Sequence, residues 1–310
     1  MLAGGVGGAR FLSGLIRRTD PRRLTVIGNT GDDEEFFGLH VAPDLDTVVY
    51  TLAGVAPRRR GWGLAGDTFA CLAALGRLGL PTWFRLGDRD LATHVLRGAA
   101  LRAGGRLTDI TADLCRRLGI AARVLPMSDD AVRTIVHSAE GDIAFQDYFV
   151  GRHCDVPVTG FAFAGIERAR PTAEVAAALG AAVLEAIILC PSNPFVSIDP
   201  ILSLPGMRQL ITGAGVPVIA VSPIIGGAAV KGPAAKMMRE LGLEPSAAAV
   251  AAHYRGLVTG FVMDKADAAL APAVEALGMT VTLTRTLMRN AADRLRLAQE
   301  CVGFARSLRR

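Results

Sequence analysis

The chain is poor in cysteine and in aromatic residues, and it has no long hydrophobic run. Its five cysteines are odd in number and far apart, and no pair has the spacing of metal ligands, which predicts reduced thiols rather than disulfides or a cysteine metal site. No apolar run reaches the roughly 18 residues that a membrane span needs. Glycines interrupt any apolar segment near the N-terminus that would resemble a secretory signal. We therefore expect a cytoplasmic protein without a membrane partner.

The chain also lacks a strong excess of one charge. It has 34 Lys and Arg against 29 Asp and Glu, and the arginines are scattered rather than grouped with aromatic side chains. This balance suits a small anionic substrate at least as well as nucleic acid, and we expect no nucleic-acid partner. With 51% apolar residues and 35 glycines, the composition resembles that of an α/β protein. At 310 residues the chain can hold one large domain, or a core with a smaller second domain.

The chain opens on a glycine-rich segment, MLAGGVGGARFL. A glycine-rich turn before an amphipathic helix is typical of a phosphate-binding βα unit, because backbone N–H groups and the helix N-terminus face the anion. It is not a dinucleotide fingerprint, since Arg10 stands where the third glycine belongs, and no Walker-type Gly-Lys-Ser/Thr follows. A tight turn without a ligand is the alternative. Only Met1 to Ala3 precede the turn, so we expect a first strand that is very short or that begins before Met1.

Carboxylates are concentrated directly after the strand-like run 24–27, where the chain carries Asp32, Asp33, Glu34, Glu35, Asp44 and Asp46. Oxygen ligands of this kind suit Mg²⁺, which usually takes one or two protein carboxylates and completes its shell with substrate phosphates. Solvated loop positions or helix caps are the alternative for residues 33–35. If the segment 43–47 is extended, Asp44 and Asp46 point the same way. This spacing is compatible with a functional role for the pair and with a structural one.

A second polar segment covers residues 86–94, LGDRDLATH. A helix that starts near Asp90 would place Asp90 and His94 one turn apart on one face, with Arg89 at the mouth of a site, able to pair with a phosphate or a carboxylate. An internal salt-bridge network is the alternative. Just before this segment, we expect Asp67 to cap a helix that ends at Gly79. The basic turn 58–63 is expected to be solvated.

The remaining pattern predicts a Rossmann-like α/β fold, with a mainly parallel sheet flanked by helices. The apolar runs 186–189 and 216–221 each end in a polar turn at the carboxyl edge of the sheet, and 260–264 and 279–283 are the last two strands. Residues 134–137 and 143–146 predict a β-hairpin. This hairpin marks an inserted α+β subdomain at about 58–158, so the core would comprise 1–57 and 159–310. The chain ends in an Arg-rich amphipathic helix.

Five motifs in order carry a family resemblance: GGVGGARFL from Gly4, PDLDT from Pro43, GDRDLATH from Gly87, PSNP from Pro191 and SPII from Ser222. Together they resemble the 2-phospho-L-lactate transferase family of coenzyme F420 biosynthesis. The sequences of the first and third motifs are closer to its bacterial phosphoenolpyruvate transferase branch. Each motif alone is weak, whereas five in sequence are specific. The resemblance covers residues 4 to about 264. The run Gly31 to Phe37 is more acidic than the family's pattern, which leaves open which acid binds metal.

This resemblance implies a Mg²⁺-dependent transferase with two substrates, the deazaflavin Fo and a guanosine diphosphate ester of phosphoenolpyruvate or 2-phospho-L-lactate. The ribityl hydroxyl of Fo would attack the phosphorus that bears the three-carbon acid, releasing GMP and giving (dehydro) coenzyme F420-0. Asp44 and Asp46 would bind Mg²⁺, and one of them would help to deprotonate the hydroxyl. The residues expected to bind substrate are Gly5, Gly7, Gly8, Arg10, Asn29, Thr30, Thr47, Asp67, Arg89, His94, Ser128, Asp129, Ser192, Asn193 and Ser222.

Two other functions remain as alternatives. Non-catalytic nucleotide-sugar-binding regulators share the glycine turn and the fold, but they should lack the GDRDLATH segment. A nicotinamide-dependent dehydrogenase is disfavoured by Arg10. The identity of the three-carbon acid stays open between phosphoenolpyruvate, phospholactate and phosphoglycerate. No sequence pattern indicates the oligomeric state, and we expect a homodimer.

Overall fold

The protein is built around one twisted parallel sheet. The structure, a computed structural model, describes residues 1–57 and 60–309, so the first two residues of the basic turn 58–63 lie outside the described part. Every neighbouring pair in the sheet is parallel. In spatial order its seven strands are β14 (Thr280–Thr284), β13 (Gly260–Asp264), β10 (Val218–Val221), β9 (Ile187–Leu189), β1 (Leu2–Ala3), β2 (Thr25–Gly28) and β5 (Arg123–Pro126). The Rossmann-like expectation is confirmed, and the first strand is indeed very short.

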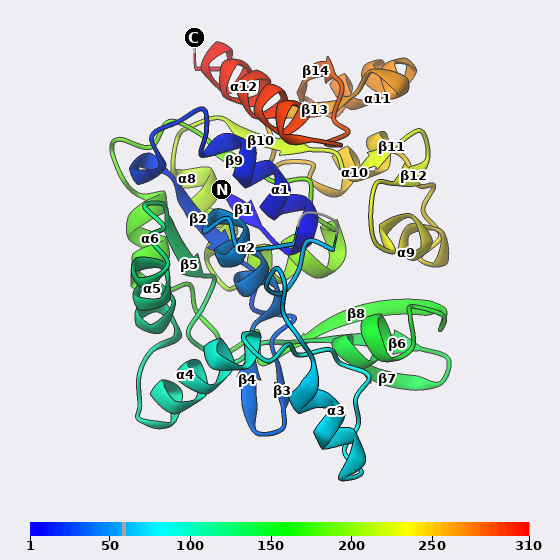
Figure 1. The fold of residues 1–310 in the computed structure, drawn as a ribbon. Coiled ribbons are helices and arrows are strands. Elements are labelled where there is room, and N and C mark those ends of the chain that lie inside the picture. Colours follow the sequence, from blue (N-terminus) through cyan, green and yellow to red (C-terminus); the bar gives the residue numbers. More distant parts are fainter. Residues whose placement is uncertain (58–59, 310) are drawn as a thin grey trace.

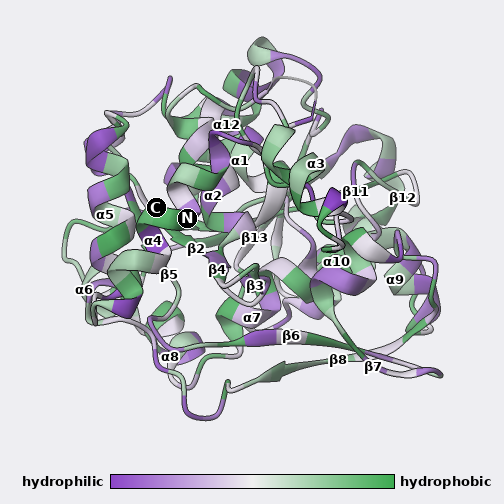
Figure 2. Ribbon diagram, turned by 60° about the horizontal axis from the view of Figure 1, so that its bottom comes forward, coloured by the Kyte–Doolittle hydropathy of each residue, from purple (hydrophilic) through white to green (hydrophobic). Residues whose placement is uncertain are grey.

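The inner strands β1, β9, β10 and β13 are buried on both sides, because alternate residues face two separate cores. Leu2, Ile187 and Leu189 belong to one hydrophobic cluster, whereas their neighbours Ala3 and Ile188 belong to the other. The second cluster is covered by α1 (Gly5–Leu15), α2 (Pro43–Leu52), α5 (Leu107–Arg117) and α12 (Ala291–Ser307). Figure 2 shows hydrophobic and hydrophilic residues alternating along α5, as expected for a helix that covers a sheet with one face.

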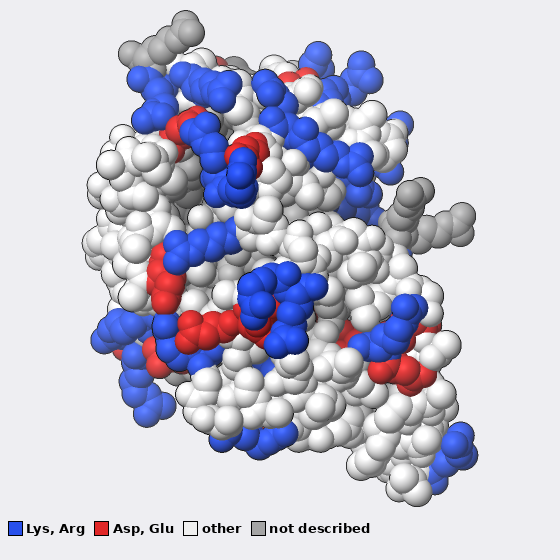
Figure 3. Space-filling view, turned by 60° about the vertical axis from the view of Figure 1, so that its left-hand side comes forward, with Lys and Arg blue, Asp and Glu red and all other residues white. Residues whose placement is uncertain are grey.

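The opposite face is covered by short helices and by a second sheet. The helices are α6 (Ala173–Leu179), α7 (Asp199–Leu202), α8 (Met207–Gly213), α9 (Ala234–Glu240), α10 (Ala247–His253) and α11 (Ala271–Glu275). The structure also contains two 3₁₀-helices, η1 (Pro21–Arg23) and η4 (Lys265–Leu270), and two π-helices, η2 (Asp147–Gly151) and η3 (Pro194–Ile198). On the side shown in Figure 3, Lys and Arg lie in separate groups with Asp and Glu between them. In the described ranges, no helix has the length and apolarity of a membrane span.

Antiparallel strands form three small sheets outside the main one. The predicted hairpin is present as β6 (Arg133–Ser138) and β7 (Gly141–Ala144), and β8 (Val158–Ala164) joins them. Two further hairpins pair β3 (Glu34–Phe36) with β4 (Leu39–Val41), and β11 (Ile224–Ile225) with β12 (Ala228–Ala229). In Figure 1 the β6–β8 sheet lies apart from the main sheet, and α3 (Ala70–Arg77) and α4 (Asp90–Arg102) complete the helices.

The sheets do not follow the predicted subdomain bounds of 58 and 158. Strand β5 lies inside this range but pairs with β2 in the main sheet, whereas β8 extends the small sheet to Ala164. A hairpin is a local signal, but the partner of a third strand is set by contacts distant in sequence. The division into 1–57 with 159–310 and 58–158 stays a prediction.

The two ends of the sequence meet in the packing of α1 against α12 (Figure 1). A Cβ on Gly14 would lie 2.2 Å from the backbone oxygen of Arg294. We predict that Gly14→Ala lowers the free energy of unfolding by about 1–3 kcal/mol, because α12 must move away from α1. Urea denaturation followed by circular dichroism measures this change.

The matched control is Gly303→Ala in α12, where an added Cβ meets nothing within 4 Å. This substitution removes a helical glycine without a clash and should stabilise by about 0.5–1 kcal/mol. Equal effects of the two substitutions would contradict the close packing of α1 and α12.

Candidate active site

The candidate site lies where the sheet order changes direction. From β1 the chain proceeds to β2 and β5 on one side, and β9, β10, β13 and β14 fill the other side. The loops that leave the carboxyl ends of β1 and β9 therefore diverge, and in open α/β sheets such a crevice is the usual ligand site. The glycine segment follows β1, and Pro191-Ser192-Asn193 follows β9. Both predicted motifs meet here.

The glycines allow these two segments to touch. A Cβ on Gly7 would lie 2.3 Å from the Pro191 oxygen, and a Cβ on Gly8 would lie 2.7 Å from Ser192 Oγ. The Ser192 hydroxyl donates to the Gly4 oxygen at 2.7 Å, and the Gly4 N–H lies 3.2 Å from Ser192 Oγ. The expectation of a separate turn before the helix is wrong, because α1 already begins at Gly5. Close packing explains Gly7 and Gly8 at least as well as phosphate binding does.

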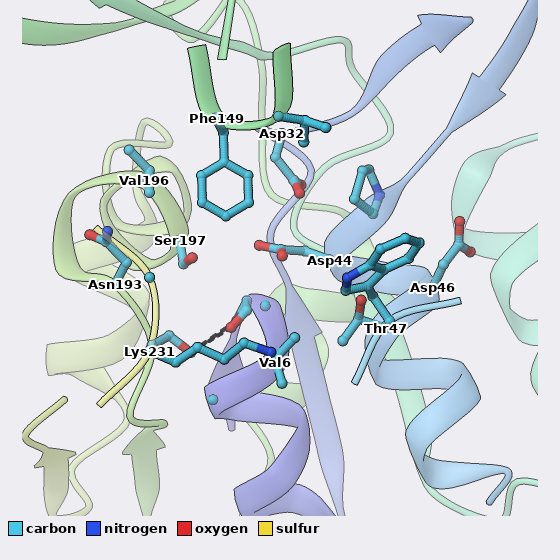
Figure 4. A pocket seen from close by; sticks show the side chains of 18 of the residues that line it. Val6, Asp32, Asp44, Asp46, Thr47, Phe149, Asn193, Val196, Ser197 and Lys231 are labelled. Atoms are coloured by element: carbon cyan, nitrogen blue, oxygen red, sulfur yellow. Dashed lines mark hydrogen bonds between the residues drawn. The ribbon is translucent and has the colours of Figure 1, made fainter. Parts of the chain in front are cut away.

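A cavity of about 520 Å³ opens at this crevice. Of the predicted site residues, its lining includes Gly5, Gly7, Arg10, Asp44, Asp46, Thr47, His94, Ser192, Asn193 and Ser222. Segments distant in sequence, from α1 to Met288, thus line one cavity. Figure 4 shows Asp32 and Asp44 pointing toward the same central space, with Asn193 and Ser197 across from Thr47.

Asp32 and Asp44 form a buried pair of carboxyl groups. Their side chains are within hydrogen-bonding contact of each other, and the Asn29 amide donates to Asp44 Oδ2 at 3.0 Å and to Asp32 Oδ1 at 3.4 Å. Burial raises the pKa of Asp44 to about 6, against the hydrogen bonds from Asn29 and from the Gly5 N–H. Burial and the neighbouring charge of Asp44 raise the pKa of Asp32 well above its usual value. The carboxyl groups of Asp32 and Asp44 therefore favour a cation bound between them.

Asp46 does not accompany Asp44. The expectation of an extended segment is wrong, because residues 43–52 form α2 with both acids in its first turn. Residues two apart on a helix point about 200° from each other. Asp46 forms a two-pronged salt bridge with the buried Arg97 instead, with one N–O distance of 3.1 Å. Its carboxylate reaches the cavity only from the side of α4 (Asp90–Arg102).

Helix α4 begins at Asp90, as expected, but the polar residues of the segment 86–94 make different contacts from those predicted. Asp90 and His94 lie one turn apart, with Asp90 Oδ1 3.4 Å from His94 Nε2. Asp67 does not cap α3. It accepts the N–H groups of Arg89 and Asp90 at the start of α4, while Asp88 accepts those of Ala70 and Cys71 at the start of α3. Each helix is therefore held by an acid that precedes the other helix.

Several predicted binding residues lie outside the cavity lining. Arg89 donates to the backbone oxygens of Ala65 and Gly66, both at 2.8 Å, rather than pointing into the site. Ser128 donates to the Arg170 oxygen, and Asp129 accepts from Arg106 and from Thr108. These roles are structural in this conformation. Of the predicted residues outside the lining, Gly8, Asn29, Thr30 and Ser128 are buried, and Asn29 acts by holding Asp32 and Asp44.

Other lining residues were not predicted. Lys231 reaches over Val6 (Figure 4) and donates to the Arg60 oxygen at 2.9 Å. Burial, and then the positive charge of Arg10, lower the pKa of its ammonium group. The sequence signal for Lys231 was its place after a strand-end turn. Arg97 does not line the cavity, and its sequence signal was its place seven residues after Asp90 on one face of the same helix.

Aromatic side chains line the outer part of the cavity. Phe84 stacks on Phe36 with ring centroids 4.0 Å apart, and Trp83 meets Phe84 edge-on. On another wall Phe149 stacks on Phe145. Trp83 and Phe149 keep 39% and 40% of their surface exposed. In a chain with few aromatics, exposed rings that line one cavity indicate a flat apolar ligand.

Comparison with known proteins decides the family. The model of the family described as 2-phospho-L-lactate transferase CofD matches residues 1–286. The chain belongs to the CofD family. The match confirms the resemblance carried by the five motifs, and it covers all seven strands of the main sheet and the β6–β8 sheet.

Curated relatives of the CofD family are similar over their whole length. A phosphoenolpyruvate transferase of Streptomyces griseus is 44% identical, with 100% of this chain and 98% of the relative covered. A 2-phospho-L-lactate transferase of Methanosarcina acetivorans is 41% identical, with 98% of each covered. A solved structure of a UPF0052 family protein from Bacillus halodurans shares the fold, with a TM-score of 0.62 at 15% identity over 97% of each chain.

The opposite environments of Asp44 and Asp46 give a stability prediction. In metal-free buffer, Asp46→Asn should lower the free energy of unfolding by about 3–5 kcal/mol, because it leaves the buried Arg97 guanidinium without a counter-charge. Asp44→Asn should leave this free energy unchanged or raise it, because it removes one of two adjacent buried acids. Chemical denaturation with EDTA present compares the two. Equal destabilisation by both substitutions would show that the acids share one environment.

Proposed function

We propose that this CofD family member transfers a phospho-three-carbon-acid group, phosphoenolpyruvate or 2-phospho-L-lactate, from its guanosine diphosphate ester to the ribityl hydroxyl of the deazaflavin Fo. GMP is released and (dehydro) coenzyme F420-0 is formed. Family membership and the names of the relatives support the reaction class. The single observation that carries the proposal is the Asp32–Asp44 pair, which faces the cavity at the switch point of the sheet.

The residues present fit a Mg²⁺ ion. Asp32 and Asp44 would hold it, because their buried and mutually repelling carboxylates need a positive charge between them. In the part of the chain that the structure describes, no group of three or more His, Cys, Asp or Glu is arranged as a metal site. Mg²⁺ typically takes one or two protein carboxylates and completes its shell with phosphates and water. The ligand pair is therefore Asp32 with Asp44, rather than Asp44 with Asp46.

The reaction exchanges one P–O bond for another. The ribityl oxygen forms a bond to the phosphorus that bears the three-carbon acid, and the bond from this phosphorus to the oxygen bridging to GMP breaks. The hydroxyl proton passes to a pocket carboxylate and then to water. Asp32 and Asp44 would hold a Mg²⁺ ion that would supply positive charge to the diphosphate and to the leaving GMP. Asn29 keeps Asp32 and Asp44 in place throughout.

Cationic side chains line the cavity beside this pair. Arg10 lies one turn into α1, Lys231 crosses over Val6, and Arg85 belongs to the same lining. The donor carries a diphosphate and a carboxylate, so it needs positive charge in addition to a metal ion. The aromatic wall of Trp83 and Phe149 suits the planar ring of a deazaflavin.

The regulator alternative would need no transfer chemistry. The GDRDLATH segment argues against it, because this segment places Asp90 and His94 in the lining of the cavity. Tight binding of a nucleotide sugar without formation of an Fo adduct would favour the regulator.

The test is a Mg²⁺-dependent assay with Fo and guanosine diphosphate esters of the three candidate acids, with products identified by mass. We expect a phosphodiester of Fo whose mass names the donor, and loss of turnover when EDTA removes the metal. Asp44→Asn should reduce turnover by at least about 10²-fold while fold and nucleotide binding persist. Glu35→Gln, on the exposed part of β3, is the matched control and should stay active. A fully active Asp44→Asn enzyme would refute the metal role of this residue.

A further inference from the structure

His94 belongs to a chain of buried polar groups behind the cavity wall. Its Nδ1 lies 3.4 Å from a terminal nitrogen of Arg97 and 3.8 Å from Asp46 Oδ2. Its Nε2 lies 3.4 Å from Asp90 Oδ1. All four residues are at most 7% exposed, and of them Asp46, Asp90 and His94 line the cavity.

The contact with Arg97 determines which ring nitrogen carries the proton. A guanidinium group has only donors, so a histidine nitrogen within hydrogen-bonding distance of it must accept. The alternative, an Nδ1–H that donates to Asp46, is too long at 3.8 Å. Arg97 itself is fixed by Asp46 and by the backbone oxygen of His40. This contact therefore favours the tautomer of His94 that carries its proton on Nε2.

The Nε2 atom of His94 is buried and has no hydrogen-bond partner among the described residues. Asp90 Oδ1 lies 3.4 Å away but does not form a hydrogen bond with Nε2, and it accepts instead from the Tyr50 hydroxyl at 2.7 Å. A buried donor without a partner carries a substantial cost, which a ligand oxygen can remove. Because His94 lines the cavity, this N–H is available to a bound substrate.

We infer that His94 contributes to catalysis as a neutral hydrogen-bond donor through Nε2, and that Arg97 is a positioning residue that sets this tautomer. The inference rests on the proposed transfer reaction. The Nε2–H donates to an oxygen that gains negative charge in the reaction, on the transferred phosphoryl group or on the three-carbon acid. His94 does not take the hydroxyl proton, since Nε2 already carries one. The charged or titratable groups around the ring are Asp46, Asp90, Arg97 and Tyr50.

Two amide substitutions separate the roles of the two nitrogens. In His94→Gln the amide NH₂ can replace Nε2–H, whereas in His94→Asn the shorter amide reaches only the position of Nδ1. We expect His94→Gln to keep kcat within about 10-fold of wild type, and His94→Asn to lose roughly 10²–10³-fold, the effect of removing a transition-state donor. If His94 is the base instead, both variants lose activity equally, and that result overturns the inference.

The tautomer can be observed without any substrate. The chain has five histidines, and ¹⁵N spectra of the His-labelled protein, with His94 assigned from the His94→Gln variant, distinguish protonated from unprotonated ring nitrogens. We expect an unprotonated Nδ1 and a protonated Nε2 at pH 7, and a mixture of tautomers in Arg97→Met. If this variant does not fold, the wild-type spectrum alone decides, because a protonated Nδ1 would refute the role of Arg97. Absence of any Fo adduct with wild type would instead count against the proposed function.

Discussion

The repulsion between two buried carboxyl groups is the constraint on which this site depends. Asp32 follows β2 and Asp44 begins α2, and the fold brings them into contact beside the start of α1. A Cβ on Gly4 would lie 2.4 Å from Asp44 Oδ2, so the backbone of the glycine segment is part of the same cluster. Such an arrangement costs stability unless a cation or a proton neutralises it. This unfavourable free energy arises at the point where the diverging loops leave room for a ligand.

The first turn of α2 serves two purposes with two acids. Asp44 faces the carboxyl edge of the sheet, whereas Asp46 faces α4 and neutralises Arg97. Through Arg97 and His94 the same salt bridge reaches a second wall of the cavity. The helical spacing of the PDLDT motif therefore connects the acid pair to the polar face of α4. An extended segment would have pointed both acids to one side and left Arg97 without a partner.

The order of strands and helices was predictable because parallel strands buried on both faces appear as short apolar runs, as in 187–189 and 218–221. Most of the candidate site was also predictable, since polar residues after such strands collect at one edge of a sheet. The exchange of caps between Asp67 and Asp88 was not, because either acid suits either helix locally. The pairing of Asp32 with Asp44 depends on a contact between β2 and α2 that no local spacing reveals. Lys231 and the aromatic wall likewise meet the cavity only through tertiary packing.

The most direct test of the central claim is the thermal unfolding of the wild-type protein and of Asp32→Asn at increasing Mg²⁺ concentration, without substrate. An ion that binds only the folded state raises the midpoint as its concentration exceeds its dissociation constant. If Asp32 and Asp44 hold the ion, Mg²⁺ raises the midpoint of the wild type by several degrees and leaves that of Asp32→Asn nearly unchanged. An equal rise in both proteins, or none in the wild type, would contradict the account.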